Sequence, residues 1–184
     1  MCRNLALLLL CSLLVDLPGC DKRETSSSAP RDVCGLITLD EIQTIQGSPM
    51  SGTKNSAHSD GGLRVSQCFY TATEFSKSVN LALVQRDPDH PGKRSPRDFW
   101  KEKFDPYQDE EPKKESGDEK EKGPAPKTVV GLGDEAYWVA NRFGGTLYVL
   151  KGDAFISIGL GGTDDEQTKL NKSKALAQKA IQRL

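Results

Sequence analysis

The pattern of apolar and polar residues divides the chain into stretches of very different character. Residues 1–19 contain 13 apolar side chains, whereas residues 21–32 contain one and residues 105–127 contain two. Two mixed stretches, 33–104 and 128–184, together hold 49 apolar side chains among 129 residues. That proportion is enough for one modest hydrophobic core, so the pattern predicts a single domain with a polar segment inserted into it.

Three stretches have the periodicity and the start signals of helices. Thr38 and Glu41 have the spacing of a capping box. Ser95 and Pro96 are typical of an N-cap and a first helical position, and an apolar face that contains Trp100 follows them. The three predicted helices cover residues 38–46, a segment from Ser95 that includes Phe99, Trp100 and Phe104, and residues 163–184, where Thr163 and Glu166 have the spacing of a second capping box.

Alternating apolar and polar positions predict five strands. They cover residues 67–73, 79–85, 135–140, 146–151 and 154–160. Compact glycine turns separate the last three strands, which is typical of antiparallel hairpins, and the polar stretch 48–65 is predicted to be a loop. The sequence therefore predicts an α+β domain over residues 33–184, in which about five antiparallel strands pack with three helices in the order α-β-β-α-β-β-β-α.

The inserted segment at about 105–127 has the composition of a disordered region. Between Gln108 and Lys127, 12 of 20 residues are charged, with both signs mixed. Such a segment buries too little apolar surface to offset the entropy of ordering it, so we expect an exposed flexible insertion. The functional alternative is a charged docking loop.

The N-terminus has the features of an export signal. Residues 5–15 form an apolar run that is too short to span a bilayer of about 30 Å as a helix, which is typical of a signal peptide over residues 1–19. The run ends in Leu17-Pro18-Gly19-Cys20, which resembles the lipobox of bacterial lipoproteins. This resemblance implies that Cys20 becomes the first residue, carrying a diacylglycerol and acyl chains such as palmitate. The alternative is an ordinary cleaved signal peptide with an incidental cysteine.

The resemblance also implies a location for the mature chain. A lipidated Cys20 would hold the protein at the extracytoplasmic side of a membrane in the cell envelope, with the choice between inner and outer membrane left open. Residues 21–32 are predicted to form a disordered tether, which reaches at most about 40 Å when it is extended.

The remaining cysteines fit an oxidising compartment. Cys2 and Cys11 leave with the predicted signal peptide, so Cys34 and Cys68 are left as one pair. We expect a disulfide between them, which would stabilise the fold by about 3–4 kcal/mol in the chain-entropy model. The alternative is two independent buried thiols. With only two histidines in polar sequence, the cysteines lack the spacing of a zinc site, and no metal is predicted.

No catalytic or cofactor motif stands out from the sequence. Residues 131–136 spell GxGxxA, but the strand sequence after them does not fit a dinucleotide-binding turn, which opens a helix. The glycines are predicted instead to form a tight turn into a strand. The net charge of −1 argues against a nucleic-acid-binding protein. We predict no cofactor, and no enzyme activity.

The mature region also resembles a pattern found in small uncharacterised bacterial lipoproteins. Four segments carry the resemblance: 34–47, 68–70, 129–138 and 174–184. That group has no established activity, so the resemblance implies a fold and a compartment and nothing catalytic.

Aromatic residues on the predicted sheet give a candidate binding face. Both faces of the sheet carry apolar side chains, so either helices cover both faces or one face is partly open to a ligand. The candidate residues are Tyr137, Trp138, Tyr148 and Phe155. We therefore expect a membrane-anchored binding or interaction module whose ligand is an envelope protein or a lipid. The alternatives are an envelope hydrolase that acts on wall or lipid, and a passive structural lipoprotein; the oligomeric state is left open.

Overall fold

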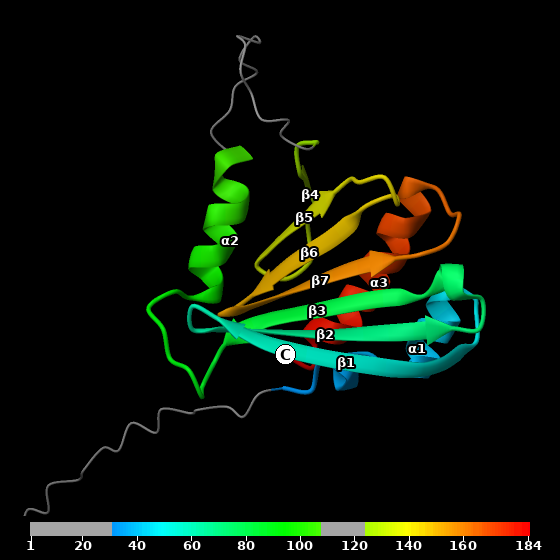
Figure 1. The fold of residues 1–184 in the computed structure, drawn as a ribbon. Coiled ribbons are helices and arrows are strands. Elements are labelled where there is room, and N and C mark those ends of the chain that lie inside the picture. Colours follow the sequence, from blue (N-terminus) through cyan, green and yellow to red (C-terminus); the bar gives the residue numbers. More distant parts are fainter. Residues whose placement is uncertain (1–30, 108–123) are drawn as a thin grey trace, which may run out of the picture.

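The computed structural model describes residues 31–107 and 124–184. They form a seven-stranded antiparallel sheet with strand order β1-β2-β3-β7-β6-β5-β4, and three α-helices pack on it (Figure 1). The strands are β1 (Met50–Asp60), β2 (Leu63–Ala72), β3 (Val79–Arg86), β4 (Lys127–Thr128), β5 (Glu135–Val139), β6 (Thr146–Lys151) and β7 (Ala154–Leu160). The helices are α1 (Leu39–Gln46), α2 (Pro96–Phe104) and α3 (Glu166–Ile181), with short 3-10 turns η1 (Val33–Leu36), η2 (Phe75–Lys77) and η3 (Asp105–Tyr107).

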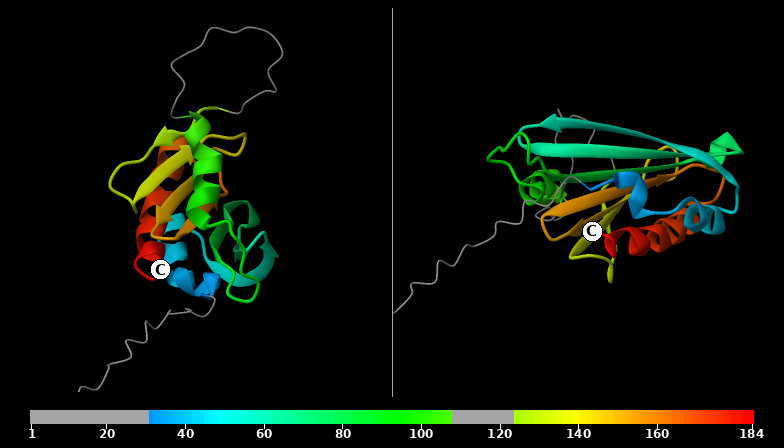
Figure 2. Two further views of the ribbon diagram at one scale, coloured as in Figure 1. Left: turned by 90° about the vertical axis from the view of Figure 1, so that its left-hand side faces the viewer. Right: turned by 90° about the horizontal axis from the view of Figure 1, so that it is seen from below.

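The helices lie on opposite faces of the sheet. The first meander, β1-β2-β3, joins the second, β4-β5-β6-β7, through the pairing of β3 with β7. Helices α1 and α3 cover one face, and α2, which follows the first meander, packs on the other face near one end of the strands (Figures 1 and 2). The prediction of an α+β domain with an antiparallel sheet and three helices is confirmed, but the prediction of five strands is wrong.

Two strands, β1 and β4, are missing from the prediction, and the longer one, β1, comes from residues 48–65, which the pattern predicts to be a loop. Eleven residues of this stretch form β1, and residues 63–65 begin β2. Gly61 and Gly62 both have positive φ and form the tight turn between the two strands. Strand β1 lies at the edge of the sheet and almost all of it is exposed on both faces, so backbone pairing holds it without any apolar alternation.

The predicted helix starts are right for two helices and wrong for the third. Thr38 and Glu41 form the expected capping box of α1, and Ser95 caps α2 with Pro96 in its first turn. The N-cap of α3 is Asp165, whose carboxylate accepts a hydrogen bond from the backbone N–H of Thr168, so Thr163 does not cap this helix.

Both ends of the predicted insertion belong to the fold. Residues 105–107 form η3 at the end of α2, and Lys127 begins β4, which pairs with β5. Residues 108–123 lie outside the described part of the chain. The same is true of the predicted signal peptide, Cys20 and most of the tether; at the tether's end, Asp32 caps η1.

An aliphatic core fills the space between the sheet and α1, α3 and η1. Leu81, Ile156 and Ile158 on the central strands are fully buried there, together with Ile42 of α1 and Leu176 of α3. Because β3, β6 and β7 are covered on both faces along part of their length, they contain runs of apolar residues as well as alternation.

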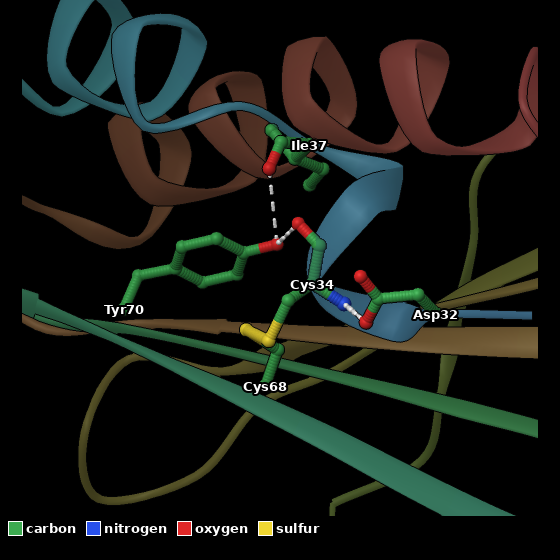
Figure 3. Close-up of a disulfide and its surroundings, with 5 residues drawn as sticks. All are labelled: Asp32, Cys34, Ile37, Cys68 and Tyr70. Carbon is green, nitrogen blue, oxygen red and sulfur yellow. Dashed lines mark hydrogen bonds between the residues drawn. A yellow bond between two sulfur atoms is a disulfide. The ribbon is translucent and has the colours of Figure 1, made fainter. Parts of the chain in front are cut away.

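A disulfide joins Cys34 of η1 to Cys68 of β2, with a Cα–Cα distance of 5.2 Å (Figure 3). Beside it, the Tyr70 hydroxyl lies 3.1 Å from the carbonyl oxygens of both Cys34 and Ile37. Burial, with a smaller contribution from the charge of Asp32, raises the pKa of this hydroxyl, so it stays a neutral donor. The N-terminal turn is therefore fixed to the sheet by a covalent bond and by a buried hydrogen bond.

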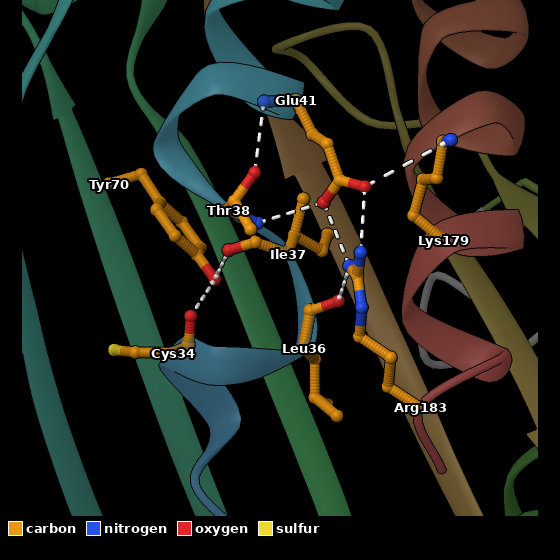
Figure 4. A network of polar contacts seen from close by, with 8 residues as sticks. All are labelled: Cys34, Leu36, Ile37, Thr38, Glu41, Tyr70, Lys179 and Arg183. Carbon is orange, nitrogen blue, oxygen red and sulfur yellow. Dashed lines mark hydrogen bonds and ion pairs between the residues drawn. The ribbon is translucent and has the colours of Figure 1, made fainter.

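A second set of polar contacts ties the two ends of the domain together (Figure 4). The Arg183 guanidinium donates to both carboxylate oxygens of Glu41, each at 2.8 Å, and to the carbonyl oxygen of Leu36 at 2.8 Å. Mainly through these hydrogen bonds from Arg183, the pKa of Glu41 falls to about 2. The C-terminal residues thus hold α1 and η1 against the end of α3.

Candidate binding surface

The strand register arranges the side chains of the α2 face in rows that run across the sheet. Side chains paired between neighbouring strands lie on the same face about 5 Å apart, so each row is a continuous strip. The covered row is Val65, Val84, Phe155 and Leu150. The middle row is Gln67, Ala82, Ser157, Tyr148 and Tyr137. The outer row is Phe69, Asn80, Gly159, Thr146 and Val139.

Helix α2 buries the covered row and reaches only the aromatic end of the middle row. Phe99 stacks on Phe155 with ring centroids 5.6 Å apart, and Trp100 meets the edge of the same ring at 5.6 Å. Phe104 lies 4.7 Å from the Tyr137 ring and 5.5 Å from the Tyr148 ring. Such aromatic pairs contribute beyond the area that they bury, which helps a helix of nine residues to stay in place.

Two contacts of polar groups at the edge of the aromatic cluster fix the position of α2 on the sheet. The Trp100 indole Nε1–H donates to the Glu135 carboxylate at 2.9 Å, so this buried donor is satisfied. The Lys103 ammonium lies 4.8 Å from the centre of the Tyr148 ring, and desolvation lowers the pKa of that amine. The aromatic cluster therefore ends at a cation–π contact, beyond which the sheet is open.

The structure divides the four predicted binding residues between the two faces. Trp138 is fully buried on the α1 and α3 face, where its indole N–H donates to Glu166 at 3.0 Å. Phe155 is 3% exposed beneath α2. Tyr137 and Tyr148 are partly exposed at the border of the aromatic cluster, so the four residues form no common binding face.

The middle and outer rows beyond α2, called the open surface below, are the uncovered part of this face. Gln67 and Asn80 are exposed, and Ala82 and Ser157 form the floor between them and Tyr148. The two rows contain amides, hydroxyls, small side chains and aromatic rings, and they contain no carboxylate. Donors, acceptors and rings in this combination suit a polar, partly aromatic contact surface.

An aromatic pair at one corner of the open surface was missed in the sequence. Phe69 of the outer row lies 6.0 Å, ring centre to ring centre, from Phe75 in η2, and Phe75 is 70% exposed. The alternation in β2 carried a signal for Phe69, because it points away from the buried Cys68 and Tyr70. The position of Phe75 depends on the turn between β2 and β3, which the pattern does not specify.

Charged groups that could suggest catalysis have structural partners instead. The Asp134 carboxylate accepts from the backbone N–H of Gly152 at 2.8 Å, which lowers its pKa, and it also pairs with Arg97. Asp87 is buried, and its hydrogen bond from the Ser59 hydroxyl is the main cause that lowers its pKa to about 2. These carboxylates are held ionised by local hydrogen bonds, which is the reverse of what a general acid needs.

The other sequence motifs also find structural roles. Gly131 and Gly133 have positive φ and make a turn into β5, as predicted, and no helix follows them. In the described part of the chain, no three His, Cys, Asp or Glu side chains come close enough to hold a metal ion. Across residues 31–107 and 124–184, no helix is both long and apolar enough to cross a membrane.

Surface cavities among the described residues are wide and rimmed by polar groups. One, of about 380 Å³, lies beside β1 and is lined by Arg31, Asn55, Ala57 and Arg64 among others. Another, of about 480 Å³, lies beside the start of α3, where the buried Lys169 ammonium donates to the carbonyl oxygen of Phe143 at 2.7 Å. Neither is the enclosed apolar pocket that binds a small hydrophobic ligand.

Comparisons with protein-family models, with curated proteins and with solved structures found no match for this chain.

Proposed function

We propose that this protein is a lipid-anchored binding module of the cell envelope, and that its open surface binds a protein partner. The observation that carries the proposal is the division of the α2 face, in which one short helix buries the aromatic cluster and leaves the rest of the middle and outer rows uncovered. A sheet face that is closed by its own helices needs no such polar rows beside an aromatic rim.

A protein partner suits the open surface better than a lipid does. Acyl chains bind in dry apolar cavities, whereas the floor here consists of Ala82, Ser157 and Gly159 between the amides of Gln67 and Asn80. The aromatic side chains that would line a lipid site are already packed against α2. Amides and hydroxyls on a sheet can pair with the polar groups of another protein, and the exposed ring of Phe75 and the partly exposed ring of Tyr148 supply apolar contact.

The location in the envelope is supported by the N-terminal sequence and by the disulfide. The segment 17–20 resembles a lipobox, and disulfides such as Cys34–Cys68 persist in oxidising compartments. Intact-mass spectrometry of the mature protein tests the anchor. We expect an N-terminus at Cys20 that carries a diacylglyceryl group, and loss of membrane association in Cys20→Ser. An unmodified N-terminus at another residue would contradict the anchor.

Charge substitutions on the open surface test the binding role. Gln67→Arg and Asn80→Arg place large side chains on exposed positions of the two rows, where they leave the core untouched. Both variants should keep the melting temperature and lose at least about tenfold of partner affinity, because each blocks close contact. Gln178→Arg on the exposed side of α3 is the matched control and should bind as the wild type does. If all three variants lost partner affinity equally, or all three kept it, the open surface would not be the binding site.

A further inference from the structure

Strand β1 presents a long edge that no strand of the described chain pairs with. It lies at the end of the strand order and its 11 residues pair only with β2. The opposite edge of the sheet is β4, which is only two residues long, and such short edges resist further pairing. Past the irregularity between Met50 and Gly52, the register of β1 is regular as far as Asp60. The unpaired backbone groups along this stretch can accept another strand.

The side chains of β1 are self-complementary when two copies pair antiparallel about Ala57. In that register Lys54 of one copy lies opposite Asp60 of the other, and the same pair recurs at the other end of the contact. Between these pairs, Asn55 faces Ser59 and Ser56 faces His58, so every pair is small, hydrogen-bonding or oppositely charged. No other two-fold register places Lys54 opposite Asp60, because the centre must lie midway between them.

Both charged residues are available for this contact. Lys54 and Asp60 are exposed, and they lie on the same face of β1 because they are six positions apart along the strand. Neither forms an ion pair or side-chain hydrogen bond within the described part of the chain. An edge lysine alone discourages strand addition, but opposite charges directly across an antiparallel pair stabilise it.

We propose that β1 is the interface of a homodimer, in which two copies pair antiparallel about Ala57 and extend the sheet to fourteen strands. The two-fold axis of such a pair is perpendicular to the sheet, so the same face of each copy points the same way. The two open surfaces then lie on one side of the dimer, and the two η1 turns, near the start of the described residues, lie on the other. If the proposed anchor is present, both copies can therefore be attached to one membrane.

A charge swap tests this register in the full chain, purified in detergent micelles and studied by analytical ultracentrifugation. Lys54→Glu or Asp60→Lys alone turns both attractive pairs of the dimer into repulsive ones, and each should weaken dimerisation by about tenfold. The combined Lys54→Glu/Asp60→Lys variant restores opposite charges and should dimerise within about threefold of the wild type. Lys101→Glu, at an exposed lysine of α2, which packs on β3 and β7, is the control for the change in net charge and should leave dimerisation unchanged.

A crosslink measures the register directly and does not depend on the strength of the dimer. Ala57→Cys should form an intermolecular disulfide under mild oxidation, since directly opposed residues have Cα atoms about 5 Å apart. Asn55→Cys should not, because in this register it lies about 13 Å along the strand from its own copy. A wild type that stays monomeric, single charge variants that dimerise normally, or equal crosslinking from both cysteines would overturn the proposal. A wild type that is monomeric and still binds its partner would overturn this proposal and leave the proposed function standing.

Discussion

The two faces of the sheet differ in how much of each is covered by helices and in the side chains that form the contact. The α1 and α3 face is aliphatic and closed, and its margins are fixed by the Cys34–Cys68 disulfide and by the contacts of Arg183. The α2 face is aromatic where it is covered, and polar where it is open. The same strands supply both faces, because successive side chains of a strand point in opposite directions.

This difference separates stability from recognition within one sheet. Substitutions on the closed face create cavities in the core or free the N-terminal turn, so they should lower the free energy of unfolding. Substitutions on the open surface remove little buried area, so they should change binding and leave stability almost unchanged.

Loss of the disulfide should be the largest single effect on the closed face. The double variant Cys34→Ala/Cys68→Ala releases η1 from β2, and we expect the free energy of unfolding to fall by about 3–4 kcal/mol. Urea titration followed by circular dichroism measures this loss. Reduction of the wild type should give a loss of similar size, and a difference under about 1 kcal/mol would mean that packing alone holds η1.

Neighbouring residues of β7 compare the two faces directly. Ile158→Ala removes a fully buried side chain from the closed face and should cost about 3 kcal/mol. Ser157→Ala changes the adjacent residue, which lies on the open surface, and should change stability by less than about 0.5 kcal/mol. Urea titration of the two variants gives the comparison, and similar losses at both positions would contradict the division of roles.

The contact that holds α2 should have an intermediate effect. Glu135→Ala leaves the buried indole N–H of Trp100 without its acceptor and should cost about 1–2 kcal/mol. Glu135→Gln keeps an acceptor oxygen and should cost less. Tryptophan fluorescence during unfolding reports both variants, and an unchanged stability in Glu135→Ala would show that packing, without this hydrogen bond, sets the position of α2.

The contact between Glu41 and Arg183 predicts a pH dependence. The pKa of Glu41 is about 2 in the folded protein, below its ordinary value of 4.5. Its contribution is therefore present above pH 4.5 and is lost as the pH falls from 4.5 to about 2. At pH 7 the Glu41→Gln variant should be less stable by about 1 kcal/mol, because the ion pair is partly exposed. The gap between wild type and variant should close in melting curves near pH 2, and a constant gap would contradict this role.

The elements that sequence patterns predict well are those in which one face is buried. The apolar positions of β7 and the capping boxes of α1 and α2 carry local signals, and the structure confirms these elements. Strand β1 carries no such signal because both of its faces are exposed. The only local feature in the sequence that indicates a strand here is the Gly61-Gly62 pair, which forms the turn into β2. Strand β1 forms because its backbone pairs with β2, and the pattern of apolar and polar residues gives no information about that pairing.

The candidate site was predicted only in part, for a related reason. The period of two places Trp138 and Tyr137 on opposite faces, but the sequence does not say which face a helix covers. The length of α2 and its position at one end of the strands decide that Phe155 is buried and that Asn80 is exposed. Cross-strand rows depend on register, which a single sequence does not supply.

Site-specific photocrosslinking in intact cells tests the central claim most directly. A photoreactive amino acid at Asn80 lies in the open surface, whereas the same group at Gln178 lies on the exposed side of α3. The account predicts a discrete protein adduct from position 80 that disappears when Gln67→Arg is added, and no such adduct from position 178. Equal adducts from both positions, or an adduct from position 80 that Gln67→Arg leaves unchanged, would contradict it.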